Sequence, residues 1–475
     1  MISEQRRNSI KAAPETIVEL THQEVHSLDQ QTLDELQLAA ARKRFDDLAA
    51  RIPIVRKLAQ EQGIERIESL ADLAPLLIQH TAYKSYPLSV LENGDFQRLT
   101  RWFDGFTTHD LSSLDASACE SIDDWIDLLD SNTDIQLLHS SGTSGKLSFL
   151  PRSQTEAGKV GLVQHLRFFE GFGEGAPGPV QGYENFPVVY PGFRYGASGQ
   201  MRRIENIRKF WHKGNGSPIV ALYPGRLSAD ALSLGGRLVA AEARGELGRM
   251  KISPKLLAKR DEILAEQRKA PEYIETFLDN IAELKGARVY MQGIPAQFYD
   301  TAVAGLKRSM KNVFHPDSLL VIGGGTKGRD LPDDMFNTVS EFMGVEAKPI
   351  YGMSEAMGGA PICDHGYYHM HPSVILIQLD PHNGEMLPRS GTVTGRLGIF
   401  DTTCWTYWGG FLSGDEITIN WADREPCACG RSGPYIHPTV RRYTEKEGGD
   451  DKITCAGAPD AHDKALDFIV GELGD

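Results

Sequence analysis

Residues 287–293 read ARVYMQG, residues 318–325 read SLLVIGGG, and residues 347–355 read AKPIYGMSE. Each of these runs is short and apolar and ends in glycine or in a glycine-containing turn, with helical stretches between them. Buried strands of a parallel or mixed sheet show this pattern when the loops at their carboxyl ends carry function. The three runs therefore predict an α/β fold with mixed β-sheets flanked by helices.

The regions on either side of these runs have their own sequence patterns. Three more strand-like runs precede them, DIQLLHSSG, FPVVYPG and SPIVALYPG, which begin at residues 134, 186 and 217. Residues 22–90 have apolar positions at helical spacing, which predicts a helical N-terminal leader. After about residue 365 the runs VILIQLD, TGRLGIFDTT and DEITINWAD predict a small, strand-rich β subdomain.

The composition excludes several classes of protein. The chain has 475 residues, of which 50 are Lys or Arg and 64 are Asp or Glu, giving a formal net charge of −14. Because general nucleic-acid binders need a basic surplus to neutralise phosphates, we expect no nucleic-acid partner. The N-terminal residues contain no apolar signal segment, and no apolar run approaches the roughly 18 residues that span a bilayer. We therefore expect a soluble cytoplasmic protein without a membrane partner.

A loop rich in small and hydroxyl residues follows the run DIQLL: residues 139–146 read HSSGTSGK. Its glycines let the backbone approach a polyphosphate, its hydroxyls and amides donate to phosphate oxygens, and Lys146 adds a positive charge. Two residues separate Gly142 from Gly145, and Leu147 follows the lysine, so the loop is not a Walker motif. A flexible polar turn is the alternative interpretation.

Four further segments follow this loop. They are Gly323-Gly324-Gly325, Tyr351-Gly352-Met353-Ser354-Glu355, Ser413-Gly414-Asp415, and Gly449-Asp450-Asp451-Lys452-Ile453 with Gly457. In this order the motifs resemble those of the adenylate-forming (acyl-adenylate, acyl-CoA synthetase) superfamily. Within it the chain is most similar to the phenylacetate–CoA ligase branch and to the acyl-protein synthetases of bacterial fatty acid reductases. These closer similarities lie in LADLAPLLIQHTAYKSYP, residues 70–87, and in Cys427-Ala428-Cys429-Gly430-Arg431.

The resemblance implies a large N-terminal adenylation domain followed by a short remainder. It divides the chain into a helical N-terminal part of that domain (1–110), an α/β nucleotide- and acid-binding core (111–365), a β-rich subdomain with a zinc site (366–445), and a hinge with a truncated C-terminal stub (446–475). Only 18 residues follow Gly457, whereas the family's mobile lid, which carries an adenylation lysine, needs on the order of a hundred residues. The candidates to replace that lysine are Lys452 and Lys464.

By matched motif, the resemblance implies ATP and Mg²⁺ as cofactors. Catalytic roles fall to Lys146, Ser354 and Glu355: the lysine holds the leaving phosphates, the serine meets the α-phosphate, and the glutamate binds Mg²⁺, a hard cation that prefers oxygen. Tyr351 stacks on the adenine ring, and Asp415 accepts both ribose hydroxyls. The other residues implied at the phosphate loop and the adenine site are Ser141, Gly142, Thr143, Ser144, Gly145, Gly323, Gly324, Gly325 and Gly352.

The cysteines provide an independent observation. Cys363 and His369 are separated by five residues, and Cys427 and Cys429 form a Cys-x-Cys pair further along the chain. Three thiolates and one imidazole make a closed tetrahedral ligand set, the composition of structural Zn²⁺ sites. Some relatives of phenylacetate–CoA ligase carry the same arrangement, and unligated thiols near a turn are the alternative interpretation. The alternatives for the fourth ligand are His365 and His371.

The hinge departs from the family pattern. An arginine usually precedes its Asp-Asp pair, but Glu447 and Gly448 stand there, so that Arg441 or Arg442 would have to substitute. Cys455 lies beside the hinge, and a thiolate there would be a competent nucleophile, as the acyl-protein synthetases form an acyl–cysteine near their C-terminus. A small buried residue is the alternative interpretation of this cysteine. The candidate acyl acceptors are thus a thiol of this chain, CoA, a carrier protein or an acyl reductase partner.

The predicted function is ATP-dependent activation of a carboxylic acid to an acyl-adenylate with release of pyrophosphate, after which the acyl group passes to a thiol or a partner enzyme. Phe193 and Tyr195 lie where the superfamily lines its acid pocket and suit an aryl or a fatty acid. Arg194, or Arg202 and Arg203, would suit a second carboxylate. The alternative class is a non-catalytic, zinc-stabilised nucleotide-fold binding or scaffold protein, which the altered hinge favours. For the oligomeric state, a homodimer is the base expectation.

Overall fold

The computed structural model describes residues 2–25, 27–140, 146–161, 163, 182–245, 265, 268–325, 329–423 and 425–442. Its centre is a six-stranded sheet of order β5-β4-β6-β7-β8-β9, in which only β9 runs antiparallel to its neighbour. The strands span Val188–Tyr195 (β4), Ile219–Arg226 (β5), Tyr290–Gly293 (β6), Leu319–Ile322 (β7), Lys348–Gly352 (β8) and Gly359–Pro361 (β9). The runs from FPVVYPG to AKPIYGMSE thus form one sheet, and the predicted α/β fold class is confirmed.

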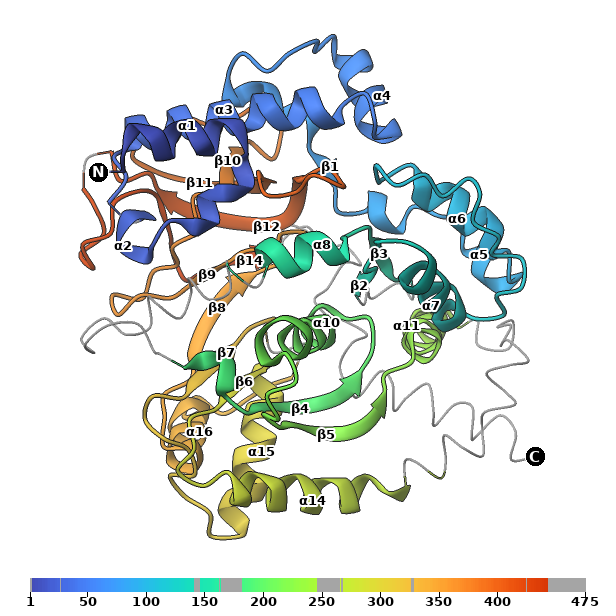
Figure 1. Cartoon of the computed structure of the whole chain (residues 1–475), viewed down its shortest axis with the longest axis vertical. Helices are drawn as coiled ribbons and strands as arrows, with labels where there is room; N and C mark the ends of the chain where they lie inside the picture. The colour runs from blue at the N-terminus through green and yellow to red at the C-terminus, as the bar shows by residue number, and fades with distance from the viewer. Residues whose placement is uncertain are drawn as a thin grey trace.

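Helices cover both faces of this sheet (Figure 1). Because alternate side chains of a strand point to opposite faces, Tyr190 and Tyr290 pack with the helices on one side, and Val189 and Met291 with those on the other. The first set is α7 (Ile122–Asn132), α10 (Gly199–Asn206) and α11 (Ala229–Arg244), and the second is α14 (Ala270–Glu283), α15 (Pro295–Lys307) and α16 (Met335–Met343). With both faces covered, a ligand meets the parallel strands at their carboxyl ends.

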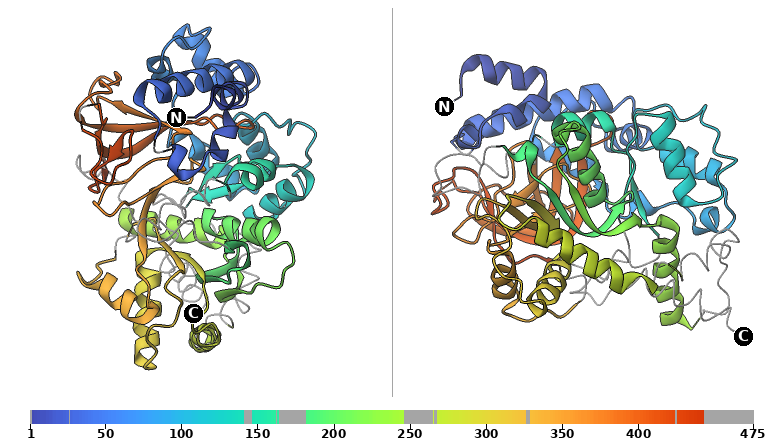
Figure 2. Two further views of the ribbon diagram at one scale, coloured as in Figure 1. Left: turned by 60° about the vertical axis from the view of Figure 1, so that its left-hand side comes forward. Right: turned by 60° about the horizontal axis from the view of Figure 1, so that its bottom comes forward.

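A second six-stranded sheet packs against the N-terminal helices (Figure 2). Its strands are β1 (Ile78–Gln79), β10 (Val374–Leu379), β11 (Thr392–Asp401), β12 (Gly410–Asn420), β13 (Tyr435–Ile436) and β14 (Arg441–Arg442). The leader helices α3 (Gln30–Leu48) and α4 (Pro53–Gln62) share a hydrophobic core with β10, β11 and β12. β1 pairs in parallel with β12, so the leader also supplies a strand to this subdomain.

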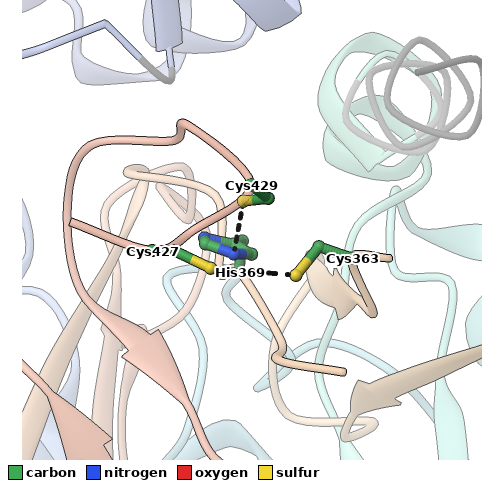
Figure 3. Close-up of side chains that lie close together, drawn as sticks. All are labelled: Cys363, His369, Cys427 and Cys429. Carbon is green, nitrogen blue, oxygen red and sulfur yellow. Dashed lines mark hydrogen bonds between the residues drawn. The ribbon is translucent and has the colours of Figure 1, made fainter. Parts of the chain in front are cut away.

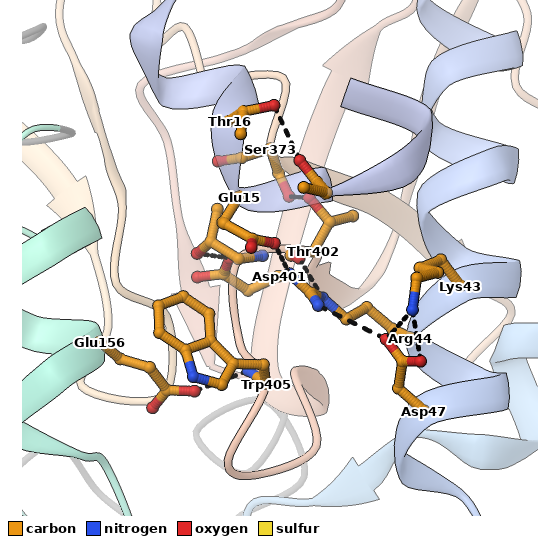
Figure 4. Close-up of polar contacts among 12 residues, drawn as sticks. Glu15, Thr16, Lys43, Arg44, Asp47, Glu156, Ser373, Asp401, Thr402 and Trp405 are labelled. Atoms are coloured by element: carbon orange, nitrogen blue, oxygen red, sulfur yellow. Dashed lines mark hydrogen bonds and ion pairs between the residues drawn. The ribbon is translucent and has the colours of Figure 1, made fainter. Parts of the chain in front are cut away.

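Buried charged side chains hold the connection between β11 and β12 (Figure 4). Arg44 on α3 donates from Nε to the carbonyl of Thr402 over 2.7 Å. The fully buried carboxylate of Glu156, on the short helix α8 (Gln154–Glu156), accepts the backbone N–H of Thr406 over 2.6 Å. Buried ionic groups of this kind need hydrogen-bond partners, and here the partners are backbone groups of the connection. Two distant segments therefore fix it in place.

The hairpin of β2 (Leu138–Ser140) and β3 (Ser148–Leu150) carries the predicted phosphate loop. Residues 141–145, which join the two strands, lie outside the described residues. In the described part of the chain, no helix is long and apolar enough to cross a membrane. The remaining elements are α1 (Glu4–Ala12), η1 (Pro14–Glu19), α2 (His22–Val25), η2 (Leu70–Leu76), η3 (Ala82–Lys84), α5 (Leu88–Glu92), α6 (Phe96–Asp104), η4 (Ala157–Gly161), η5 (Tyr183–Asn185) and η6 (Ile207–His212).

Candidate active site and metal cluster

Two motif residues that are far apart in the sequence meet between the two sheets. Tyr351 on β8 donates from its hydroxyl to Oδ2 of Asp415 on β12 over 2.8 Å. Arg442, the partner of Asp415 in the β12–β14 ladder, places Nε 3.0 Å from Oδ1 of the same carboxylate. The structure thus brings together the residues implied for the adenine and the ribose. Of the two arginines considered for the hinge role, Arg442 is the one beside them.

Burial and charge set the protonation of this group. Burial, together with the Asp415 carboxylate, raises the pKa of Tyr351 well above its ordinary value, so the phenol stays a neutral donor. The Arg442 guanidinium supplies the counter-charge to Asp415, which is only 8% exposed. An ionised carboxylate accepts hydrogen bonds through both oxygens, which is the chemistry that recognition of a ribose diol requires.

The turn after β8 carries Ser354 and Glu355. Arg152 donates from Nη2 to the carbonyl of Ser354 over 2.9 Å. A Cβ added to Gly199 would lie 3.9 Å from Ser354 Oγ, so the start of α10 approaches this serine. Burial raises the pKa of Glu355, whereas nearby cationic side chains lower it. A carboxylate in these surroundings suits a bound cation, since a cation favours its ionised form.

The glycines after β7 leave the backbone at the strand ends without side chains. A Cβ on Gly323 would stand 2.9 Å from Cγ1 of Ile350, so a larger residue would displace β8. Gly324 and Gly325 have φ angles of 86° and 66°, in the left-handed region that favours glycine. Gly352 ends β8, where it pairs with β9. These positions let a planar ring approach the backbone closely.

Lys146 lies at the base of the β2–β3 hairpin, against the N-terminal segment. Its Nζ donates to the carbonyl of Tyr86 over 2.8 Å and stands 5.6 Å from the centre of the Tyr86 ring. The ammonium is therefore held by the leader. The other phosphate-loop and hinge residues named from the sequence lie outside the described residues: Ser141, Gly142, Thr143, Ser144, Gly145, Glu447, Gly448, Lys452, Cys455, Gly457 and Lys464.

His80 lies beside the site, although the sequence analysis gives it no role. Its backbone N–H donates to the carbonyl of Leu412 over 3.1 Å, which extends the parallel β1–β12 pairing by one residue. Its ring Cε1 is 3.8 Å from a Cβ built on Gly414. The ring is also close enough to Glu355 to interact with that carboxyl group electrostatically. The one local signal is the short apolar run LLI before it, which the helical pattern of the leader obscures.

The residues considered for acid binding follow β4. Phe193 stacks on Tyr223 of β5, with ring centres 4.7 Å apart. Tyr195 is 48% exposed. The guanidinium carbon of Arg194 lies over its ring, 4.5 Å from the ring centre. Phe193 is thus engaged in packing between strands, and Tyr195 faces largely to solvent.

Four predicted metal ligands converge where the loop between β9 and β10 meets the segment after β12 (Figure 3). The Sγ atoms of Cys363, Cys427 and Cys429 and a ring nitrogen of His369 all lie within 4.8 Å of one another. Cys363 Sγ is 3.9 Å from Cys427 Sγ, and Cys429 Sγ is 3.4 Å from His369 Nε2. The alternative ligand His371 instead shares a hydrogen bond through Nδ1 with a serine hydroxyl.

The cluster has the chemistry of a closed zinc site. Three sulfurs and one nitrogen suit a borderline ion such as Zn²⁺ and not Mg²⁺ or Ca²⁺, which prefer oxygen. Burial raises the pKa of Cys427 to about 12 and also raises the pKa of Cys429. Without a cation the thiols of Cys427 and Cys429 are therefore neutral, and a metal ion that binds them would release protons. The remaining alternative, His365, is exposed and lies outside the group.

No protein-family model matches the chain, and no curated protein matches it. Solved structures do match. An open conformation of 2-hydroxyisobutyryl-CoA ligase, in complex with 2-HIB-AMP and CoA, aligns over 88% of this chain and 76% of its own, at 12% identity and a TM-score of 0.50. The chain shares the fold of this ligase. The fold that the motif order implies is therefore confirmed.

Two further solved structures are similar over part of their length. The same ligase in the postadenylation state with R3-HIB-AMP aligns over 88% of this chain and 69% of its own, at 14% identity and a TM-score of 0.49. Apo MatB from Rhodopseudomonas palustris aligns over 63% of this chain and 46% of its own, at 15% identity and a TM-score of 0.35.

Proposed function

We propose that this chain is an ATP-dependent carboxylate-activating ligase that forms an acyl-adenylate. The observation that carries the proposal is the meeting of Tyr351, Asp415 and Arg442 at the sheet ends, with Glu355 on the adjoining turn. The shared fold with a ligase crystallised with 2-HIB-AMP adds support.

In the proposed reaction, a carboxylate oxygen of the acid attacks the α-phosphorus of ATP. The bond from that phosphorus to the bridging oxygen of the β-phosphate breaks, and pyrophosphate leaves with the bond electrons. Asp415 accepts the ribose hydroxyls, Tyr351 packs on the adenine ring, and the backbone after Gly323 lines its other face. Lys146 faces the leaving phosphates. Catalysis here depends on position and charge neutralisation more than on covalent chemistry by the protein.

Glu355 is the proposed ligand of Mg²⁺. The ion, when bound, would neutralise phosphate charge as the leaving group departs. Arg442 is the proposed substitute for the hinge arginine, because its guanidinium already lies against the ribose-site carboxylate. Its side chain is 33% exposed, so it can exchange Asp415 for a ligand oxygen without burying an unpaired charge.

The acyl group then passes to a thiol, whose sulfur attacks the acyl carbon and releases AMP. CoA, a carrier protein, a reductase partner and Cys455 are the proposed acceptors, and the structure of 2-hydroxyisobutyryl-CoA ligase contains CoA. Incubation with labelled acid and ATP separates them: label on the chain that Cys455→Ser removes identifies the cysteine. Label that appears only on added CoA identifies CoA and contradicts the acyl–cysteine.

The cluster of Cys363, His369, Cys427 and Cys429 is proposed to hold one Zn²⁺ with a structural role. Bound there, the ion would cross-link the loop after β9 to the segment after β12. No step of the reaction runs through it. Elemental analysis of protein purified without chelator tests the assignment: one zinc per chain is expected, and a value near zero would remove it.

The function itself is tested by acid-dependent exchange of labelled pyrophosphate into ATP, measured over a panel of aryl, fatty and short dicarboxylic acids. Exchange that requires both an acid and Mg²⁺ supports the proposal. Failure of all acids, together with no ATP binding by calorimetry, would reject it in favour of a zinc-stabilised binding protein.

A further inference from the structure

Three arginines flank the region where β4 meets α10, and two of them have carboxylate partners within the chain. Arg194 pairs with Glu205, and its side chain is 12% exposed. Arg202 pairs with Asp130, 2.6 Å between Nη1 and Oδ2, and its side chain is 13% exposed. The charges of both arginines are neutralised internally, so these residues stabilise the fold and are not open to a ligand anion.

The third arginine, Arg203, has different surroundings. Among the described residues, no carboxylate lies within ion-pairing distance of its guanidinium. Its Nη1 donates instead to Oε1 of Gln292 over 3.4 Å. Burial raises the pKa of Tyr290 to about 12, and the nearby charge of Arg203 opposes part of that rise. Arg203 belongs to α10 and is partly buried. A partly buried cation without a carboxylate at ion-pairing distance among the described residues gains from an anionic ligand, because burial removes part of its hydration.

The neighbours of Arg203 form one hydrogen-bonded network on the α10 face of the sheet. Tyr290 donates from its hydroxyl to Oε1 of Gln292 over 2.7 Å, and Gln292 donates from Nε2 to the carbonyl of Gln200 over 2.9 Å. Tyr190 donates from its hydroxyl to Oε1 of Gln200 over 2.9 Å. Tyr190, Tyr290 and Gln292 are each 2% exposed. The hydrogen-bonded neighbours of Arg203 on this face are therefore polar groups.

This network begins at the proposed site of activation. Gly199 is the first residue of α10 and lies next to Ser354. A Cβ built on Gly199 would be 3.9 Å from Ser354 Oγ. Gln200 follows Gly199, and Arg203 lies three residues further along the helix. From Gly199 to Arg203 the helix advances by four residues, a rise of about 6 Å. A substrate whose carboxylate is activated at Ser354 therefore meets Arg203 only a few carbon atoms away.

From these positions we infer that the acid is a short dicarboxylic acid whose second carboxylate binds Arg203, with Gln292 orienting the guanidinium. The planar guanidinium matches a carboxylate in a two-point contact that an ammonium cannot reproduce. The inference rests on the proposed function and assigns the substrate class for the same site.

Pyrophosphate exchange with chain-matched acids tests this assignment: succinate and glutarate against butyrate and pentanoate, with phenylacetate and decanoate beside them. We expect kcat/KM for a dicarboxylic acid to exceed that for its monocarboxylic match at least tenfold. Arg203→Gln should raise the KM for the dicarboxylic acid at least tenfold and leave the KM for ATP unchanged, and Arg203→Lys should fall between. Arg208→Gln is the control, since Arg208 is 59% exposed and is the next arginine along the chain.

Three results would overturn the inference. The first is that the wild type uses the chain-matched monocarboxylic acid, phenylacetate or decanoate as well as it uses the dicarboxylic acid. That result would leave the ligase function intact but reject the dicarboxylic substrate. An unchanged KM for the dicarboxylic acid in Arg203→Gln would reject the role of Arg203. Absence of exchange with every acid would reject the proposed function and this inference with it. The unchanged KM for ATP serves as the check that Arg203→Gln is folded.

Discussion

The metal cluster and the nucleotide-site residues differ in what completes them. The cluster gathers four side chains whose ligand atoms face one another within 4.8 Å, so one ion satisfies all of them. At the nucleotide site, Tyr351 and Arg442 are both bonded to Asp415 and must share or exchange that carboxylate when a ligand arrives. In the proposed roles, the first arrangement stabilises the fold, and the second binds and releases a nucleotide. Substitutions should therefore affect stability at one region and activity at the other.

The largest expected effect is on activity, in Asp415→Asn. The amide has the same shape but accepts fewer hydrogen bonds and loses the ion pair with Arg442, so exchange should fall by at least about 100-fold. The midpoint of denaturant unfolding should change much less than the activity, because the Arg442 side chain is 33% exposed and keeps part of its hydration. Glu416→Gln is the matched control, since alternate residues of β12 face opposite sides. Near-normal exchange in Asp415→Asn would contradict the ribose role.

Next is Cys427→Ser, which removes one ligand from the cluster. We expect zinc content to fall from one per chain toward zero and the free energy of unfolding to drop by about 3 kcal/mol, because binding of a structural ion is coupled to folding. Cys119→Ser should keep both its zinc and its stability. A Cys427→Ser protein that is as stable as the wild type would show that the cluster is not a structural metal site.

A pH effect of similar size is expected from His139 on β2. His139 is 2% exposed, and its two ring nitrogens have no hydrogen-bond partner among the described residues. Burial lowers the pKa of His139 from 6.5 to about 4. Between these values the unfolded chain binds a proton that the folded chain does not, so stability falls as pH falls through this window. The loss is about 3 kcal/mol at 1.36 kcal/mol per pKa unit.

Denaturant unfolding of wild type and His139→Gln at pH 7 and pH 4 measures this loss. The wild type should lose about 3 kcal/mol more than the variant, whereas His382→Gln, which removes an exposed imidazole, should follow the wild type. Parallel pH dependence of His139→Gln and wild type would show that His139 is not a buried neutral imidazole.

The smallest effect is expected in Tyr351→Phe. The ring stays to pack on the adenine, and only the hydroxyl bonded to Asp415 is lost, a hydrogen bond worth about 1 kcal/mol. The KM for ATP should rise about threefold to fivefold with kcat unchanged. A loss as large as that of Asp415→Asn would mean that the phenol acts in the chemical step, and the two residues would then form one catalytic unit.

The sequence predicts well those features that local pattern determines. Apolar runs that end in glycine mark β4 to β8, and the spacing of Cys363, His369 and the Cys-x-Cys pair identifies all four cluster residues. It predicts poorly the features that depend on pairing between distant segments. His80 reaches the site only because β1 pairs with β12, more than three hundred residues later.

The arginines show the same limit. Arg194, Arg202 and Arg203 have the same residue type and nearly the same position in the sequence, so pattern alone cannot separate them. Two of them meet carboxylates, one from α7 and one from α10 itself, and the third meets a glutamine of β6. Which charge stays open to a ligand is thus decided by packing.

The central claim, formation of an acyl-adenylate, is tested most directly by following oxygen from the acid. The acid is labelled with ¹⁸O in its carboxylate and incubated with the protein, Mg·ATP and hydroxylamine, whose nitrogen attacks the acyl carbon and releases AMP. Mass spectrometry should find one ¹⁸O in AMP and none in pyrophosphate, because the attacking carboxylate oxygen stays on the α-phosphorus. Unlabelled AMP, or ADP with labelled phosphate, would contradict the account.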